Sequence, residues 1–266
     1  MPGEQHGRRG TSTVLLMLGT MTVMSAFSVA AVADYRETNV SDGGTIVGRI
    51  WFPQEYPERE RIRIATDPAV CGASKLTEDC VVDEDTRGLR YVVVSLVDIT
   101  SGRALELEVI DPETQETHIV TWEDPVYLDQ KGCTYVPHVQ VAFPGSKLVF
   151  RNNDGLLHNV HTYTEEGTFF NIAQPAVLKE FSRALPDLAG VVTAKCDVHT
   201  WMNAYIVLAE HPYYSVSDKD GKYRLTDVPA GSYTIRAWHE AMGNMEKTVT
   251  VTAGETVMVD YELLPE

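Results

Sequence analysis

Short apolar runs separated by turn residues dominate the chain after its first 33 residues. Runs rich in Val, Ile, Thr and aromatic residues recur between clusters of Gly, Pro, Asn and Asp, a pattern typical of β-strands joined by turns. No segment sustains the 3.6-residue period of an amphipathic helix. The runs are 45–52, 91–98, 139–143, 147–151, 191–195, 204–209, 233–238 and 248–251. The pattern predicts an all-β protein built of sandwiches or Greek-key barrels, with residues 53–63 and 101–124 as surface connections.

The first 33 residues differ from the rest of the chain. Arg8 and Arg9 precede an apolar run over residues 14–32, which closes on Ala31-Val32-Ala33. This order is typical of a secretory signal peptide, here expected to be cut before Asp34. An uncleaved membrane anchor is the alternative, because the run approaches the length of a transmembrane span. We therefore expect a periplasmic or otherwise extracytoplasmic protein, without stable membrane insertion of the mature chain.

Net charge narrows the class of partner. The 266 residues include 22 Lys and Arg and 38 Asp and Glu, a formal charge of −16. Without Glu4, Arg8 and Arg9 of the leader the balance is 20 against 37, or −17, and residues 34–130 carry −12 of it. Such a chain is a poor ligand for nucleic acid or anionic lipid. The acidic excess forms either a solvated face that maintains solubility or a docking patch for a basic protein.

Residues able to bind a metal concentrate in two stretches, 150–161 and 195–202. The second has the spacing C-x-x-H-x-x-M, which places a thiolate, an imidazole and a thioether on one tight loop between two strands. A second imidazole comes from the first stretch. This set suits copper that alternates between Cu(I) and Cu(II), because sulfur favours the reduced ion and imidazole binds both. The predicted copper ligands are His158, Cys196, His199 and Met202.

Each of these residues has a simpler interpretation when taken alone. A Met beside a Trp commonly fills a core, a His after a turn commonly lies at the surface, and a Cys in an exported protein is commonly half of a disulfide. The conjunction of all four ligand types, the short spacing and the strand-rich setting favours the copper site.

The two stretches resemble the small blue copper proteins, or cupredoxins. The resemblance is carried by Asn153-Asp154, by His158-Asn159-Val160 and by the downstream ligand loop, whose length is closest to the amicyanin type. Further segments are similar to bacterial exported cupredoxin-domain proteins often labelled methylamine-utilisation-like, in which a carboxypeptidase-regulatory-like β-sandwich follows the cupredoxin domain. These segments are 129–133, 137–139, 211–214, 220–221 and 238–240.

This resemblance implies a fold and a domain order. The fold is an all-β cupredoxin Greek-key sandwich or barrel followed by a small carboxypeptidase-regulatory-like, or transthyretin-like, β-sandwich. The expected divisions are a signal peptide at 1–33, an N-terminal β segment at 34–88, the cupredoxin domain at 89–210 and the carboxypeptidase-regulatory-like sandwich at 211–266.

The resemblance also implies roles for single residues. His158, Cys196 and His199 would be the strong copper ligands, Met202 would be the axial one, and Asn159 would tie the two ligand loops together by hydrogen bonds. Electrons would pass through the edge of His199, because the last histidine of such a loop typically reaches the surface through an apolar patch.

The histidines outside the four-ligand set include three with open roles, and three cysteines also remain outside it. His161 lies three residues after His158 and would face the other side of the sheet, so we expect a neighbour and not a ligand. His138 is either a second-shell donor or a secondary metal contact, and His239 has no assigned role. Three remaining thiols indicate one disulfide and one leftover cysteine. The resemblance favours a bond between Cys71 and Cys133, with Cys80 an open alternative partner of either.

The predicted function is extracytoplasmic electron transfer by one type 1 copper ion. The expected partner is a redox protein, either a basic c-type cytochrome or a dehydrogenase or oxidase. The alternatives are a copper chaperone or storage protein and an accessory protein of a copper enzyme. A copper enzyme itself would need a second centre with three clustered histidines, and the remaining histidines are scattered along the sequence.

Overall fold

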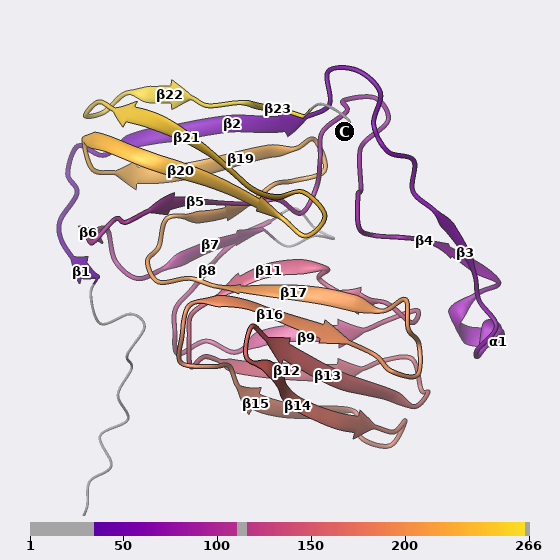
Figure 1. Ribbon diagram of the computed structural model, residues 1–266. Coiled ribbons are helices and arrows are strands. Elements are labelled where there is room, and N and C mark those ends of the chain that lie inside the picture. Colours follow the sequence, from indigo (N-terminus) through magenta and orange to yellow (C-terminus); the bar gives the residue numbers. More distant parts are fainter. Residues whose placement is uncertain (1–34, 111–115, 264–266) are drawn as a thin grey trace, which may run out of the picture.

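The computed structural model describes residues 35–110 and 116–263, and its strands form two stacked β-sandwiches (Figure 1). This confirms the all-β class. The expected signal peptide and its cleavage point lie outside the described residues. Within the described ranges, no helix is long and apolar enough to cross a membrane.

The lower sandwich in Figure 1 is formed by residues 126–208. One sheet has the strand order β10-β9-β12-β15 and the other has the order β11-β17-β16-β13-β14. Leu128, Phe150 and Ile206 are completely buried in the core between them. The strands are β9 (Val126–Gln130), β10 (Tyr135–Val136), β11 (Val139–Ala142), β12 (Lys147–Asn152), β13 (His158–Thr164), β14 (Gly167–Gln174), β15 (Glu180–Ala184), β16 (Gly190–Lys195) and β17 (Asn203–Leu208).

The upper sandwich also has two sheets, in the orders β18-β5-β20-β21 and β19-β2-β22, and β23 continues the pairing along β2. Its core buries Ile46, Ile50 and Ile235 completely. The strands are β2 (Gly44–Trp51), β5 (Val93–Val97), β18 (Tyr214–Val216), β19 (Lys222–Val228), β20 (Gly231–His239), β21 (Gly243–Val251), β22 (Thr256–Met258) and β23 (Tyr261–Glu262).

The lower sandwich is inserted between two parts of the upper one. The sequence-based divisions set residues 34–88 apart and placed 93–97 in the cupredoxin domain, whereas β2 and β5 both pair with strands of residues 211–263. The physical reason is the position of the two strands in their sheets. β2 lies between β19 and β22, and β5 lies between β18 and β20, so the C-terminal strands alone would lack the centre of each sheet.

Residues 101–124 are more than a surface connection. They contain β6 (Ser101–Gly102), which pairs with β1 (Arg36–Glu37), and the hairpin of β7 (Leu107–Ile110) and β8 (Thr117–Val120). Leu107 is 1% exposed because it packs in a third apolar cluster with residues of both sandwiches, including Val93 and Val141. This cluster joins the two sandwiches.

A separate arm, residues 61–76, reaches from the upper sandwich alongside the lower one (Figure 1). It consists of β3 (Arg61–Arg63), the short helix α1 (Pro68–Cys71) and β4 (Ser74–Leu76), and β3 pairs with β4. Ile64 of the arm is 4% exposed and belongs to the lower core. A disulfide from Cys71 to Cys133, in the turn between β9 and β10, attaches the arm covalently. The arm thereby reaches the end of the lower sandwich that carries the predicted ligands.

Candidate metal centre

Two neighbouring antiparallel strands position the predicted ligands. His158 begins β13, and Cys196 directly follows β16. Since the register aligns His161 with Lys195, the start of β13 lies beside the end of β16. His199 and Met202 follow in the loop from β16 to β17. Strand pairing therefore brings residues 38 positions apart to one edge of one sheet.

Three ligand atoms form a compact triangle. The Sγ of Cys196 is 3.9 Å from Nδ1 of His158 and 3.8 Å from Nδ1 of His199, and the two nitrogens are 3.0 Å apart. All three side chains are at most 2% exposed. A point in this plane equidistant from the three atoms lies about 2.1 Å from each, close to the length of metal–imidazole and metal–thiolate bonds. The residues present thus fit one copper ion.

Met202 lies in the same closed loop. The N–H of Cys196 donates to the carbonyl of Met202 at 3.2 Å, and the N–H of Met202 donates to the carbonyl of His199 at 2.9 Å. The Met202 side chain is 1% exposed and packs in the lower core cluster together with Cys196. The loop therefore buries the Met202 thioether in the same core cluster as Cys196.

The surroundings of Cys196 favour a thiolate. Burial raises the pKa of its thiol, but hydrogen bonds from His158 and from the backbone N–H groups of Asn159 and His199 outweigh burial and lower it. For His158 burial acts in the lowering direction, while the Asp154 carboxylate and the Cys196 sulfur raise its pKa to about 9. Without a metal, these contacts therefore favour the thiolate form of Cys196, which is the form that binds cations.

Asn159 connects the two ligand stretches. Its amide nitrogen donates to Oδ1 of Asn171 at 2.8 Å and to Oδ2 of Asp197 at 2.9 Å, and its Oδ1 accepts the backbone N–H of Asp197. Asp197 directly follows the predicted ligand Cys196. These bonds attach the loop after β16 to β13, the strand that begins with His158.

A carboxylate lies on the outer nitrogen of each predicted ligand histidine. Nε2 of His158 is 2.9 Å from Asp154 Oδ2, and that carboxylate also accepts the backbone N–H groups of Gly132 and Cys133. Nε2 of His199 is 3.1 Å from Oδ2 of Asp67, in the arm. With both outer nitrogens engaged, both Nδ1 atoms face Cys196.

The expectation that the edge of His199 reaches the surface is wrong. His199 is 0% exposed, and its outer nitrogen contacts Asp67 instead of solvent. The cause is the arm, which contributes a cover from outside the sandwich that holds the ligands. No local motif marks Asp67, although Cys71 lies four residues later and reaches this end through its disulfide. Asp154 lies in a segment on which the cupredoxin resemblance rests, but the sequence does not indicate its contact with His158.

The other two candidate histidines lie away from the triangle. Nδ1 of His161 is 3.0 Å from Oδ2 of Asp197, and its ring stacks on Tyr163. His138 lies between the sandwiches, where Nδ1 donates to the carbonyl of Asn203 at 3.2 Å and Nε2 contacts the Glu240 carboxylate. Burial acts to lower the pKa of His138, but Glu240 outweighs burial and raises it. His138 therefore forms part of an ionic contact between the two sandwiches.

Cys80 and His239 are buried away from the ligand triangle. Cys80 is a free thiol, 7% exposed, in the upper core. His239 is 0% exposed, with an Nε2 that has no hydrogen-bond partner among the described residues. Neither belongs to the groups of metal-binding side chains found in the described part of the chain.

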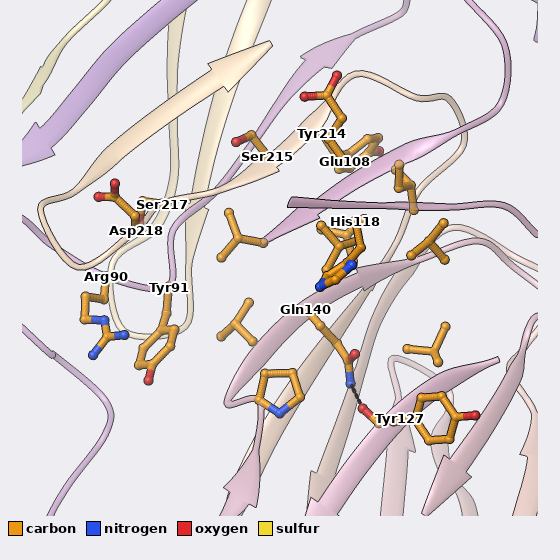
Figure 2. Close-up of a pocket in the computed structure, with 18 of the residues that line it drawn as sticks. Arg90, Tyr91, Glu108, His118, Tyr127, Gln140, Tyr214, Ser215, Ser217 and Asp218 are labelled. Atoms are coloured by element: carbon orange, nitrogen blue, oxygen red, sulfur yellow. Dashed lines mark hydrogen bonds between the residues drawn. The ribbon is translucent and has the colours of Figure 1, made fainter. Parts of the chain in front are cut away.

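A cavity of about 360 Å³ lies between the sandwiches, apart from the ligand triangle (Figure 2). Apolar side chains from β7, β8, β11 and β18 line most of it, with Tyr91, His118 and Tyr214 at its wall. Gln140 points into the same region and donates to the carbonyl of Tyr127 at 3.1 Å. None of the four predicted ligands borders this cavity.

Comparisons with solved structures return copper proteins at low similarity. A purple cupredoxin from Nitrosopumilus maritimus is 15% identical, with a TM-score of 0.28, and the match covers 32% of this chain and 99% of that one. Amicyanin from Paracoccus versutus is 17% identical, with a TM-score of 0.29 and coverage of 32% and 82%. A copper-containing nitrite reductase from Thermus scotoductus is 16% identical, with a TM-score of 0.27 and coverage of 32% and 22%.

No curated protein sequence is significantly similar to this chain. A family model does match part of it, over residues 187–264. The matched range begins just before β16, in the lower sandwich, and continues through all the C-terminal strands of the upper one. β2 and β5, which complete the upper sandwich, lie outside the match. The C-terminal part of the chain is thus similar to the carboxypeptidase regulatory-like domain.

Proposed function

We propose that this protein is an extracytoplasmic electron carrier with a single type 1 copper site. His158, Cys196 and His199 would bind the ion most strongly, Met202 would be its weak fourth ligand, and the bound ion would supply the Cu(I)/Cu(II) couple. The observation that carries the proposal is the buried triangle of two Nδ1 atoms and one Sγ, with sides of 3.0, 3.8 and 3.9 Å. A thiolate, two imidazoles and a nearby thioether match a blue-copper ligand set.

The protein side chains would hold the ligand geometry constant during electron transfer. Asp154 and Asp67 fix the rings of His158 and His199, and the N–H groups of Asn159 and His199 point at the Cys196 sulfur. Burial excludes water from the ligand atoms, so their arrangement changes little between the two charge states.

An electron carrier fits the described residues better than a copper enzyme. The three groups of candidate metal ligands in the described part of the chain all contain His158 or His199, and none has three histidines. A second copper centre for substrate would need its own histidine cluster. A copper chaperone or storage protein is the other candidate, but a closed ligand set with fixed rings favours electron transfer over metal release.

The location and the partner are part of the same proposal. The disulfide, together with the signal peptide expected at residues 1–33, suits an oxidising extracytoplasmic compartment, which we propose to be the periplasm. We propose a redox protein as the partner, a basic c-type cytochrome or a dehydrogenase or oxidase, because the chain has a formal charge of −16.

Visible and electron paramagnetic resonance spectra of the copper-loaded mature protein test this function. We expect an intense thiolate-to-copper band in the oxidised protein, its loss on reduction, and an unusually small copper hyperfine splitting. Copper that binds only as colourless Cu(I) would instead indicate storage or delivery. A weakly coloured Cu(II) spectrum with a normal splitting would contradict a type 1 site.

A further inference from the structure

The arm places a carboxylate on the outer nitrogen of His199, one of the predicted ligands. Asp67 lies outside both sandwiches, its side chain is 44% exposed, and its Oδ2 is 3.1 Å from Nε2 of the buried His199. We infer that Asp67 is a positioning residue of the metal centre, held there by the disulfide-linked arm. It fixes the His199 ring and closes the ring edge to solvent. The inference rests on the proposed copper function only for its effect on the reduction potential.

The local conformation of Asp67 supports this role. Asp67 is the N-cap residue of α1, and such an aspartate usually accepts a helix N–H with its side chain. Here the backbone carbonyl of Asp67 accepts the N–H groups of Val70 and Cys71 at 3.0 and 2.9 Å, and the carboxylate makes no capping bond. The residue adopts a left-handed conformation with φ 50° and ψ 43°. The carboxylate is thus left available for His199.

Three contacts hold the arm against the ligand end of the lower sandwich. Ile64 is buried in the lower core, and Nζ of Lys75 donates to Oγ1 of Thr134 at 3.1 Å. The Cys71–Cys133 disulfide is the third contact, and its sulfur atoms lie within 4.8 Å of a ring nitrogen of His199. The turn that bears Cys133 also anchors Asp154, the carboxylate on the other ligand histidine. One turn therefore supports both outer carboxylates.

A carboxylate on an outer imidazole nitrogen makes that imidazole a stronger donor and stabilises the more positive metal ion. Asp67 therefore favours Cu(II) over Cu(I). Asp67→Asn removes the charge but leaves an oxygen that can accept the Nε2–H bond, whereas Asp67→Ala removes both. The two substitutions separate the effect of charge from the effect of cover and orientation.

The shielding of the His199 ring by Asp67 is tested in the metal-free protein. The measurement is carbethoxylation of His199 by diethyl pyrocarbonate, followed by peptide mass spectrometry. We expect Asp67→Ala and the double variant Cys71→Ser/Cys133→Ser to accelerate modification of His199 at least tenfold. Glu60→Gln, an exposed neutralisation next to the arm, should have no effect. His211 in the upper sandwich, 5% exposed, is the internal reference. Unchanged rates at His199, or equal acceleration at His211, would overturn the assignment.

The charge effect is tested by the reduction potential of the copper-loaded protein. Asp67→Asn should shift the Cu(I)/Cu(II) equilibrium about tenfold towards Cu(I), or about 59 mV upward for one electron. The shift should disappear in the Cys71→Ser/Cys133→Ser background, where the arm is released. An equal shift in both backgrounds, or with Glu60→Gln, would overturn the role. If the wild-type protein lacks a type 1 spectrum but shows the expected carbethoxylation rates, the proposed copper function is wrong. The shielding of His199 by Asp67 and the arm is then still supported.

Discussion

Two free thiols of the described chain, Cys196 and Cys80, are both buried but have opposite electrostatic surroundings. Burial and the nearby Asp79 raise the pKa of Cys80 to about 11, so it remains a neutral thiol. Cys196 has two backbone N–H groups and a histidine directed at its sulfur, and its pKa is lowered despite burial. Of these two buried cysteines, Cys196 therefore has the greater thiolate character.

This contrast predicts the effect of removing each thiol. Cys196→Ser should abolish the intense visible band of the copper-loaded protein, because the band arises from charge transfer between thiolate and copper. Cys80→Ser is the matched control and should keep the band unchanged. Circular dichroism should show intact β structure in both variants. A band that survives in Cys196→Ser would rule out this residue as the ligand.

Met202 is expected to tune the metal more than to retain it. Met202→Leu preserves most of the buried volume but removes the weak sulfur donor, which favours Cu(I). The variant should keep copper and have a higher reduction potential than wild type, as measured by redox titration of the visible band. Loss of copper, or an unchanged potential, would contradict the axial role.

His211 gives the fold a measurable dependence on pH. Its Nε2 donates to the carbonyl of Leu96 at 2.9 Å, and its Nδ1 accepts the N–H of Tyr213, so both nitrogens are in use in the neutral ring. Burial lowers its pKa to about 4. The unfolded chain binds the proton at higher pH, so the stability from this residue is present above about pH 6.5 and is lost as pH falls towards 4.

The expected contribution of His211 is about 3 kcal/mol between these limits. Urea unfolding of wild type and His211→Gln at pH 7 and pH 4.5 measures it as a difference in pH dependence. The variant should lose much of the decrease in unfolding free energy that wild type shows on acidification. His118→Gln, at an exposed position, is the control and should behave as wild type. Identical pH dependence in all three proteins would contradict this account.

At the scale of elements, the apolar runs predicted most of the central strands. Seven of the eight runs coincide with strands to within two residues at each end, because these strands are buried and rich in β-branched residues. β13 and β14 were missed because His158, Asn159 and other polar residues interrupt their apolar pattern. The same side chains that obscure β13 as a strand identify it as part of the candidate site.

Long-range pairing could not be read from the sequence. β2 pairs with β22 through Thr45 and Thr256, residues far apart in the chain, and alternation within a strand carries no information about its neighbours. The contact of Asp67 with His199 depends on the path of the arm, so it could not be predicted from the sequence either. The residues of the ligand triangle could be predicted from the sequence, because two of the three lie on one short loop with a recognisable spacing.

The pairing predicts the outcome of a truncation after Glu210. β2 and β5 would lose the strands on both sides, so the upper sandwich should unfold and both strands should become sensitive to protease, whereas the disulfide-linked arm should stay attached to the lower sandwich. The lower sandwich, with its own core, should keep the copper spectrum. Proteolysis followed by mass spectrometry, together with the visible spectrum, measures the two effects. A truncated protein that protects β2 and β5 would contradict the shared architecture.

At the scale of the whole molecule, net charge should influence the encounter with a redox partner. Long-range fields accelerate association more than they strengthen binding, and they decay over about 8 Å at physiological ionic strength. Electron exchange with a basic cytochrome should therefore slow steeply as salt is added, whereas exchange with an acidic cytochrome should stay constant or accelerate. A salt-independent rate with the basic partner would leave the acidic excess only a role in solubility.

The structure refines the choice of residues for that experiment. Asp83 accepts the N–H and hydroxyl of Thr86 at 2.7 and 2.8 Å, so its replacement would disturb a turn. Glu84→Gln/Asp85→Asn removes two charges beside it without that effect. If this cluster lies near the docking face, the pair should flatten the salt dependence of the exchange rate. Glu165→Gln/Glu166→Gln, in the hairpin of β13 and β14, is the matched control.

The insertion of one sandwich into the other also dictates an order of folding. During synthesis the lower sandwich is complete once residue 208 has emerged, whereas β2 waits for β19 and β22, more than 170 residues later in the chain. Until then the apolar faces of β2 and β5 have no partner and are open to aggregation. The lower sandwich, which carries the candidate metal centre, can therefore become native while the upper sandwich is still unfolded. Mutations that slow the final strands should reduce yield without altering the metal centre.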